Sequence, residues 1–457
     1  MDKAIAAYRE SIRLDNWSPA ARLGLAEALT LKEKADEAVA ELEQAVSLSP
    51  GADEAQIALA NILDNSGKPT EAMTIYVNTA RNHPGNGQAT LALARAWQAR
   101  NRSDMAEKSF QDTIEKNPGS ADAYVGLAEL HMDANELEDA EILLLKAKSI
   151  DFNNVSSYIR LGELDQRRGN SEEALAWYQL AATLPAADQT LNLTLIDSLI
   201  RYGDYDTALS YTNRALLQRP NDGELLVRRG RIERIFGQYT ESLDSFSQAQ
   251  AQDPDNGLIY VELANLYLAQ GRVNGALASY EQALELEPEE TTYYVAASQL
   301  WVTQDEPERA QELLLEGMSR VSNPVSLYST LAAVQLQQGQ PERALQTLTD
   351  GVSELGESTE MFLAMGDYFV NRGNFEQVKE QFDQALESQP DVADVHAALG
   401  DLHMLMEEPE EAIDQYRKAI AIDPATPGHY LALGDAFQAH GSRSQALEAY
   451  RQAISTA

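Results

Sequence analysis

Apolar residues recur along this chain with the spacing that places them on one face of an α-helix. Between residues 257 and 288, two such faces occur in succession. A break at residues 270–272 separates them, and Gly271 can adopt the left-handed conformation that ends a helix. The pattern predicts two helices joined by a short turn, and Pro288 ends the second because proline cannot continue a helix. The first face consists of Tyr260, Leu263, Ala264 and Tyr267, and the second of Ala276, Tyr280, Ala283 and Leu284.

The same pair of helices recurs every 34 residues without insertion or deletion. Thirteen repeats run from residue 19 to 457, and residues 1–18 form the second half of a further repeat. We expect one continuous solenoid, in which each repeat buries its apolar face only against its neighbours. The residue that starts the packing face of the second helix is Ala38, Ala72, Ala106, Ala140, Ala174, Ala208, Ser242, Ala276, Ala310, Ala344, Val378, Ala412 and Ala446.

This pattern resembles the tetratricopeptide repeat (TPR) family over essentially the whole chain. The family pattern has a large residue at position 4, Leu-Gly or Leu-Ala at positions 7 and 8, an aromatic residue at 11 and 24, Ala at 20 and 27, and Pro at 32; residues 257–290 match it at every one of these places. The resemblance implies an all-α fold, a right-handed superhelix of antiparallel helix pairs whose concave groove binds other proteins. Departures cluster in repeats six and seven, at Thr212, Arg229 and Glu233.

The composition narrows the class of partner. The formal charge is −37, from 72 acidic and 35 basic residues, which argues against general affinity for nucleic acid or for an anionic membrane. No apolar stretch approaches the length of a membrane-spanning helix, so we expect no membrane insertion. The first ten residues are amphipathic and do not have the pattern of a signal peptide. Cysteine is absent, which excludes disulfides and leaves cytoplasmic and exported locations both open.

Arginines interrupt the acidic trend in repeats five to seven, residues 155–256. The resemblance implies that positions 2, 5, 6, 9, 12 and 13 of each first helix line the groove, which places there Arg160, Arg167, Arg201, Arg228, Arg231 and Arg234. Guanidinium groups suit carboxylates, so one interpretation is a binding site for an acidic peptide. The alternative is that the arginines pair with nearby acidic residues, namely Glu163, Glu224, Glu233 and Asp197.

Apolar residues occupy position 12 in repeats eight to twelve, residues 257–426. A continuous apolar strip in the groove could accept an amphipathic helix or an extended peptide. The alternative is that neighbouring first helices pack these side chains together. This apolar ladder consists of Leu268, Val302, Leu336, Val370 and Met404.

The two ends of the array suggest a third kind of contact. The last helix has an apolar face containing Leu447, Tyr450 and Ile454 without a following repeat, and the leading half-repeat presents Ala4 and Tyr8. Contact between these ends in successive copies would build a filament. Against this, two second helices in succession would break the repeat phase, and the alternative is a domain cut from a larger protein.

No motif for catalysis is present. The six histidines form no metal-binding pattern, and no phosphate-binding loop or nucleophile motif occurs. The sequence therefore predicts no catalytic residue, no metal ion and no cofactor. The leading hypothesis is a non-enzymatic scaffold that binds proteins or peptides. The alternatives are a self-assembling structural subunit and the binding arm of a larger enzyme.

Overall fold

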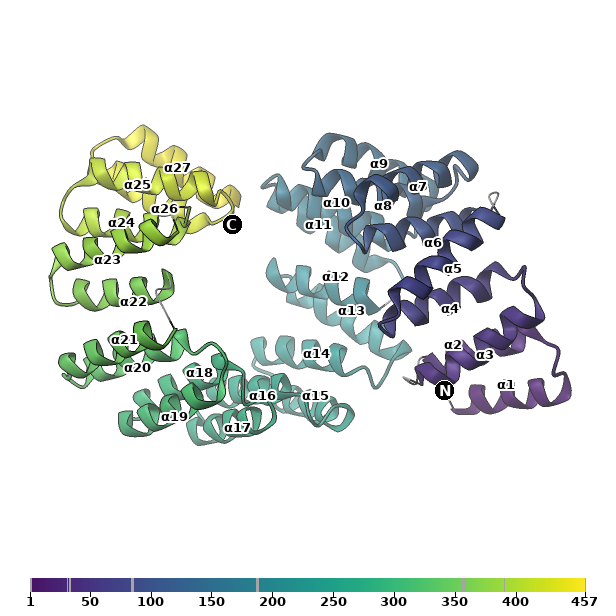
Figure 1. Ribbon diagram of the computed structural model, residues 1–457, viewed down its shortest axis with the longest axis horizontal. Helices are drawn as coiled ribbons and strands as arrows, with labels where there is room; N and C mark the ends of the chain where they lie inside the picture. The colour runs from purple at the N-terminus through teal and green to yellow at the C-terminus, as the bar shows by residue number, and fades with distance from the viewer. Residues whose placement is uncertain are drawn as a thin grey trace. The chain divides into compact units, whose positions relative to one another are not determined.

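A computed structural model describes residues 2–30, 32, 34–83, 86–185, 189–355, 359–389 and 391–456. Over these residues the chain forms 27 helices and no strand, joined by short turns into successive hairpins (Figure 1). The predicted all-α fold of packed helix pairs is confirmed.

The helices keep the 34-residue frame seen in the sequence. The leading helix is α1 (Asp2–Leu14). The first helix of each repeat, called the A helix, begins at position 1: α2 (Pro19–Thr30), α4 (Asp53–Asn65), α6 (Gly87–Gln98), α8 (Ala121–Asp133), α10 (Val155–Arg167), α12 (Gln189–Arg201), α14 (Gly223–Ile235), α16 (Gly257–Ala269), α18 (Thr291–Thr303), α20 (Val325–Gln337), α22 (Thr359–Val370), α24 (Ala393–Leu405) and α26 (Pro427–Ala439). The second, called the B helix, begins at position 17: α3 (Ala35–Leu48), α5 (Pro69–Asn82), α7 (Ser103–Lys116), α9 (Leu137–Ile150), α11 (Ser171–Thr183), α13 (Tyr205–Gln218), α15 (Tyr239–Gln252), α17 (Val273–Leu286), α19 (Pro307–Arg320), α21 (Pro341–Leu355), α23 (Phe375–Ser388), α25 (Pro409–Ile422) and α27 (Arg443–Thr456).

A left-handed residue at position 15 makes the turn between the A and B helices. The predicted turn at Gly271 is confirmed, with φ of 69°. Eight of these positions are Gly, which takes this conformation without a side-chain clash. The twelve described residues of this kind are Gly67, Asn101, Asn135, Gly169, Gly203, Gly237, Gly271, Asp305, Gly339, Gly373, Glu407 and Gly441.

Small residues opposite aromatic rings bring the two helices of a hairpin together. The ring of Tyr416, at position 24, lies against Gly400, at position 8 of the same repeat, where a β-carbon would come within 2.5 Å of the ring. Tyr416 is only 2% exposed, and Ala412 at position 20 is completely buried beside it. Interiors are close-packed, so a ring of this size needs a neighbour without a side chain. Phe246 and Gly230 make the same contact in repeat seven.

The chain divides into two compact units, residues 1–164 with 176–185, and residues 165–175 with 186–457. In the first unit, each helix from α1 to α8 contacts the one that follows it, and in the second unit each helix from α12 to α26 does so. Consecutive A helices also touch within each unit, for example α4 with α6 and α22 with α24. The single continuous solenoid expected from the sequence stays a prediction.

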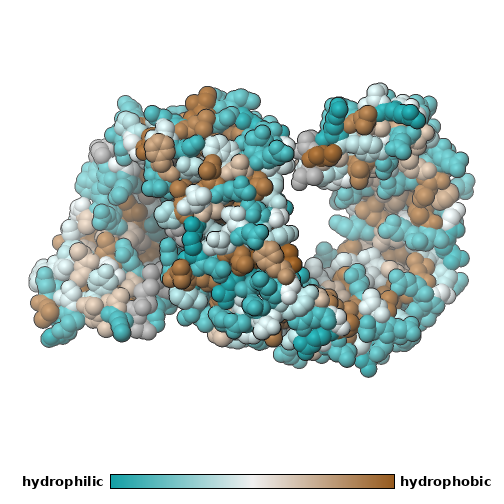
Figure 2. Space-filling model, turned by 180° about the vertical axis from the view of Figure 1, so that it is seen from behind, coloured by the Kyte–Doolittle hydropathy of each residue, from teal (hydrophilic) through white to brown (hydrophobic). Residues whose placement is uncertain are grey.

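On the face drawn in Figure 2, most of the surface is hydrophilic, and hydrophobic side chains lie in separate small patches. The longest described helix, α21, has 15 residues. Within the described ranges, no helix combines the length and the apolar character needed to cross a bilayer.

Candidate partner-binding faces

A hollow of about 620 Å³ lies where α4 meets α6 in the first unit. Every α4 residue that lines it occupies position 2, 5, 6, 9, 12 or 13, the positions that the family resemblance assigns to the groove. Tyr76 of α5 also lines it and donates a hydrogen bond from its hydroxyl to the Asn61 side-chain oxygen. The hollow was not predicted from the sequence, although alanine at position 6 of both repeats leaves room for it. Its lining is Glu54, Ile57, Ala58, Asn61, Asp64, Asn65, Tyr76, Gln88, Leu91, Ala92, Arg95, Ala96 and Ala99.

A second hollow, of about 510 Å³, lies between α18 and α20 in the other unit. Its lining carries no charged side chain and includes one member of the apolar ladder, Val302. The same face of successive A helices therefore forms a hollow in both units. The lining consists of Gln299, Val302, Thr303, Ser329, Thr330, Ala333, Val334 and Gln337.

Arg160 on α10 is held by two carboxylates of the first unit. Its Nε donates to Glu129 on α8 at 2.6 Å, and its Nη1 donates to Glu163, one turn along α10, at 2.7 Å. Although burial acts against the charge, the two carboxylates raise the pKa of Arg160 above its ordinary value. The guanidinium therefore links two consecutive A helices.

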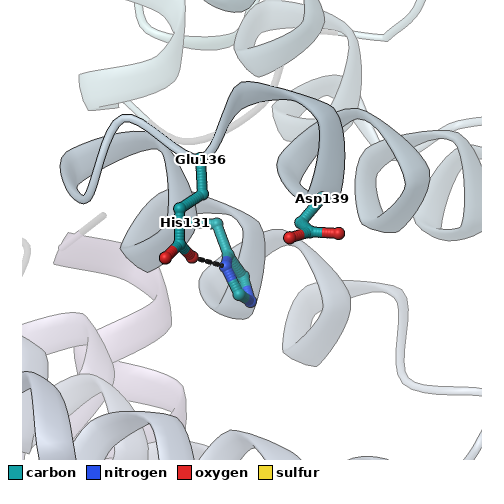
Figure 3. A group of neighbouring side chains, drawn as sticks. All are labelled: His131, Glu136 and Asp139. Carbon is teal, nitrogen blue, oxygen red and sulfur yellow. Dashed lines mark hydrogen bonds and ion pairs between the residues drawn. The ribbon is translucent and has the colours of Figure 1, made fainter.

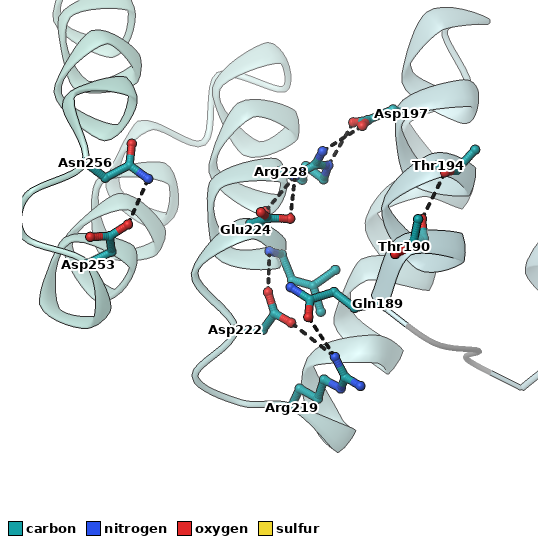
Figure 4. A network of polar contacts seen from close by, with 11 residues as sticks. Gln189, Thr190, Thr194, Asp197, Arg219, Asp222, Glu224, Arg228, Asp253 and Asn256 are labelled. Carbon is teal, nitrogen blue, oxygen red and sulfur yellow. Dashed lines mark hydrogen bonds and ion pairs between the residues drawn. The ribbon is translucent and has the colours of Figure 1, made fainter. Parts of the chain in front are cut away.

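Arg228 makes the same kind of link in the second unit (Figure 4). Its Nε and Nη2 donate to the two oxygens of Asp197 on α12, at 2.9 and 2.7 Å. Glu224, one turn earlier on α14, lies 4.0 Å from Nη1. Two parallel hydrogen bonds of this type are stronger and more directional than a single ion contact.

Arg231 and Arg234 flank a buried carboxylate on the next A helix. Arg231 Nε donates to Glu262 Oε1 at 2.7 Å, and Arg234 Nη2 lies 3.9 Å from Glu262 Oε2. Glu262 is only 6% exposed. Since a buried charge is costly without a partner, the two guanidinium groups compensate this carboxylate.

The six predicted groove arginines thus differ in how much charge they can offer to a ligand. Arg160 and Arg228 pair with neighbouring acids, which confirms the ion-pairing interpretation for these two. Arg167 also has an interaction partner. Arg201 is exposed, and among the described residues it makes no ion pair. Binding of an acidic peptide by this group stays a prediction.

The apolar ladder is partly used in packing. Leu268 is 37% exposed. The other four members are half-buried against core clusters that span neighbouring repeats: Val302, Leu336, Val370 and Met404. This arrangement favours the packing alternative for those four, whereas Val302 also faces the hollow between α18 and α20.

A buried polar network replaces the apolar contacts at the unusual residues of repeat seven. Arg229 Nε donates to the Ser245 hydroxyl at 2.8 Å, and that hydroxyl donates to Glu233 at 2.6 Å. Arg229 lies 3.6 Å from the same carboxylate. Burial raises the pKa of Glu233, against the opposing effects of the Ser245 hydrogen bond and the Arg229 charge. The network lies in the hairpin interior, between α14 and α15, and not on the groove face.

The residues predicted to join copies end to end differ in exposure. Leu447 and Ile454 are 59% and 75% exposed, and Tyr8 is 37% exposed. Ala4 is exposed as well. Tyr450 instead turns its hydroxyl toward Asp435 and donates to it at 2.7 Å. Self-association through these residues stays a prediction, and light scattering over a range of concentrations tests it.

One group of side chains in the described residues could hold a metal ion. Its members are His131, Glu136 and Asp139, whose ligand atoms lie within 4.8 Å of one another at the corner between α8 and α9 (Figure 3). His131 Nδ1 is hydrogen-bonded to Glu136 at 2.6 Å. His403 and Glu408 form the same bond at the same corner of repeat twelve, at 2.8 Å. The bond in repeat twelve forms without a third ligand nearby among the described residues. The His–Glu pair is therefore explained by its role in joining the end of the A helix to the start of the B helix, without a metal ion.

The fold and its recurring hollows define the class of protein: an array of helical hairpins with an open face along its A helices. Three sequence profiles, each described as tetratricopeptide repeat, match this chain. The chain belongs to the tetratricopeptide repeat family. The matched residues are 1–53, 261–317 and 363–427 for the first profile, 29–82, 104–164 and 235–278 for the second, and 87–108, 155–179 and 325–348 for the third.

Several solved structures are similar to this chain. Yeast Tom70 is 13% identical over 95% of this chain and 91% of that chain, with a TM-score of 0.44. The Cut9–Hcn1 hetero-tetramer of APC/C gives 11% identity over 94% and 92%, with a TM-score of 0.31. YrrB, described as a TPR protein with an unusual peptide-binding site, gives 25% identity over 42% and 98%, with a TM-score of 0.35. No curated protein sequence matches the chain.

Proposed function

We propose that this protein is a non-enzymatic scaffold that binds segments of other proteins against the exposed face of its A helices. One observation carries the proposal: in each unit, two consecutive A helices form a hollow, and every helix position that lines the α18/α20 hollow also lines the α4/α6 hollow. A surface that recurs with the repeat suits an extended segment, which can contact several repeats at once.

The chemistry of the α4/α6 hollow suits a peptide. Asn65 and Gln88 offer amide groups that can bond a peptide backbone, while Ile57 and Leu91 offer apolar contact. Asp64 is already paired with Arg100, at 2.7 Å, so its charge is compensated. Glu54 and Arg95 add one charge of each sign to the lining, so the hollow suits a partner segment without net charge.

In this proposal the arginines of repeats five to seven supply charge and the apolar ladder supplies contact area. Since Arg160 and Arg228 are paired within the chain, a carboxylate of the partner would have to compete with Glu129 or Asp197. Arg201 is the arginine that an acidic side chain of the partner would reach without such competition.

A peptide-library selection with the purified chain tests the proposal. Selected peptides should lose binding when Ala92→Trp fills the α4/α6 hollow, and should keep it in Ala40→Trp, which places the same ring on the exposed surface of α3. Thermal unfolding of both variants checks that the fold is intact. If folded Ala92→Trp binds every selected peptide as well as the wild type does, this hollow is not the binding site.

A further inference from the structure

The A helices of the second unit carry charge of one sign from α16 onward. None of the six A helices from α16 to α26 contains Lys or Arg, whereas four of the five B helices between them do, namely α19, α21, α23 and α25. All six acidic residues on these A helices occupy groove positions 2, 6 or 9. They are Glu262, Glu360, Asp367, Asp394, Asp401 and Asp435.

Three of these carboxylates form a row across helices that touch. Asp367, Asp401 and Asp435 occupy position 9 of α22, α24 and α26, and these helices contact each other in turn. The Tyr416 hydroxyl donates to Asp401 at 2.6 Å, and the Tyr450 hydroxyl donates to Asp435 at 2.7 Å. The two tyrosines, both on B helices, therefore fix the orientation of two members of the row.

The three carboxylates in this row have no positively charged Lys or Arg on their own helices. Burial raises the pKa of Asp367, and the neighbouring carboxylate of Asp401 raises it further. Nothing on these A helices compensates the repulsion, since their Lys and Arg content is zero. A cationic group of a partner near these carboxylates would favour their ionised form.

Large apolar side chains lie on the same face. Leu405, at position 13 of α24, is 54% exposed, and Leu431, at position 5 of α26, is 53% exposed. Met404 and Val370, from the apolar ladder, are half-buried on α24 and α22. Exposed leucines beside a row of carboxylates form a surface that is both apolar and acidic, and no described part of the chain covers the two leucines.

We propose that the face of α22, α24 and α26 binds a Lys- and Arg-rich segment of a partner protein, whose apolar side chains pack on Leu405 and Leu431. Charge complementarity selects this occupant, because an acidic segment or a nucleic acid would meet three carboxylates without a counter-charge. The inference rests on the proposed function, since it assigns a partner chemistry to one part of the A-helix face.

The test uses the full chain and a fluorescein-labelled amphipathic peptide of Lys and Leu, with a Glu and Leu peptide as its charge-reversed counterpart. Fluorescence anisotropy should show binding of the first peptide that depends on the three aspartates, whereas any binding of the second peptide should not change when the aspartates are replaced. The triple variant Asp367→Asn, Asp401→Asn, Asp435→Asn should weaken it about tenfold, since three rim charges are lost.

A matched control removes three charges from the B helix of repeat eleven. The control is the triple variant Glu380→Gln, Asp383→Asn, Glu387→Gln. The three residues lie together on the exposed surface of α23. This variant should bind the Lys and Leu peptide within about twofold of the wild type. Equal weakening in both triple variants would mean that the peptide only senses the net charge, and would overturn the proposal.

A second variant separates contact from charge. Leu431→Ser keeps every carboxylate and removes an exposed apolar side chain, so it should weaken the Lys and Leu peptide while leaving thermal stability unchanged. Unchanged affinity would overturn the apolar half of the proposal. If the Lys and Leu peptide fails to bind while library peptides still require the α4/α6 hollow, this inference fails and the proposed function stands.

Discussion

Arg228 holds Asp197 by two parallel hydrogen bonds, of 2.9 and 2.7 Å, and thereby joins the A helices of two consecutive repeats. The Arg228 side chain is only 17% exposed, so solvent screens this pair less than an ordinary surface pair. An arginine that the sequence predicts to lie in the groove therefore also joins two consecutive repeats.

Exchanging the two charges separates these roles. Arg228→Asp alone should destabilise the chain by about 1–2 kcal/mol, because it places two carboxylates together. The double exchange Asp197→Arg with Arg228→Asp restores an ion pair and should recover most of that loss. Urea unfolding measures both. If an acidic peptide binds to Arg228, its binding should be lost in the single variant and should stay lost in the double variant. Binding that returns in the double variant would contradict direct contact between Arg228 and the peptide.

The raised pKa of Glu233 predicts that this residue lowers the free energy of unfolding as the pH rises. A carboxyl whose pKa is higher in the folded state favours folding while it is protonated, and this advantage is lost as the pH rises through the folded value. Relative to Glu233→Gln, the wild type should therefore be most stable below the ordinary pKa of 4.5 and lose ground toward neutral pH. Free energies of unfolding of the two proteins at about pH 4 and about pH 8 test this. A difference that does not change with pH would contradict it.

The Arg229 network should be replaceable by the usual apolar pair. Arg229→Leu alone leaves the Glu233 carboxylate without its cation and should cost about 1–3 kcal/mol. Adding Glu233→Tyr creates the pair that Leu263 and Tyr267 form in the next repeat. The double variant should be at least as stable as the wild type, since a buried ion pair adds little over good packing. A double variant less stable than Arg229→Leu would show that the hairpin interior cannot take the ring.

The turn at position 15 offers a stability test of backbone conformation. Glu407 has φ of 61°, a conformation that costs an ordinary side chain about 1 kcal/mol. Glu407→Gly should therefore raise the unfolding free energy by about 0.5–1 kcal/mol, and Gly271→Ala should lower it by a similar amount. Asn135→Gly, at φ of 59°, should change less because asparagine tolerates this region. Thermal melts rank the three variants. A Gly271→Ala variant more stable than the wild type would contradict the left-handed conformation at position 15.

The contact between Gly400 and Tyr416 should not tolerate a methyl group. In Gly400→Ala the new β-carbon would come within 2.5 Å of the ring, so we expect a loss of about 1–3 kcal/mol. Gly428 provides the control: its nearest neighbour would lie at 3.8 Å, and alanine favours a helix more than glycine does. Gly428→Ala should be neutral or stabilising. Equal effects of the two substitutions would show that helix propensity, and not contact with the Tyr416 ring, determines the change in stability.

The sequence by itself determined the helical hairpins and their frame. Apolar spacing defines each helix, residues such as Gly271 define the turns, and an uninterrupted 34-residue period copies both along the chain. These are local effects, so they can be deduced from a few neighbouring residues. The tertiary structure decided which side chains remain available to a partner. Arg228 and Arg201 both match the groove pattern, yet only the approach of α12 to α14 shows that Arg228 is paired. The hollow between α4 and α6 likewise depends on how closely two A helices pack, a distance that no single repeat specifies.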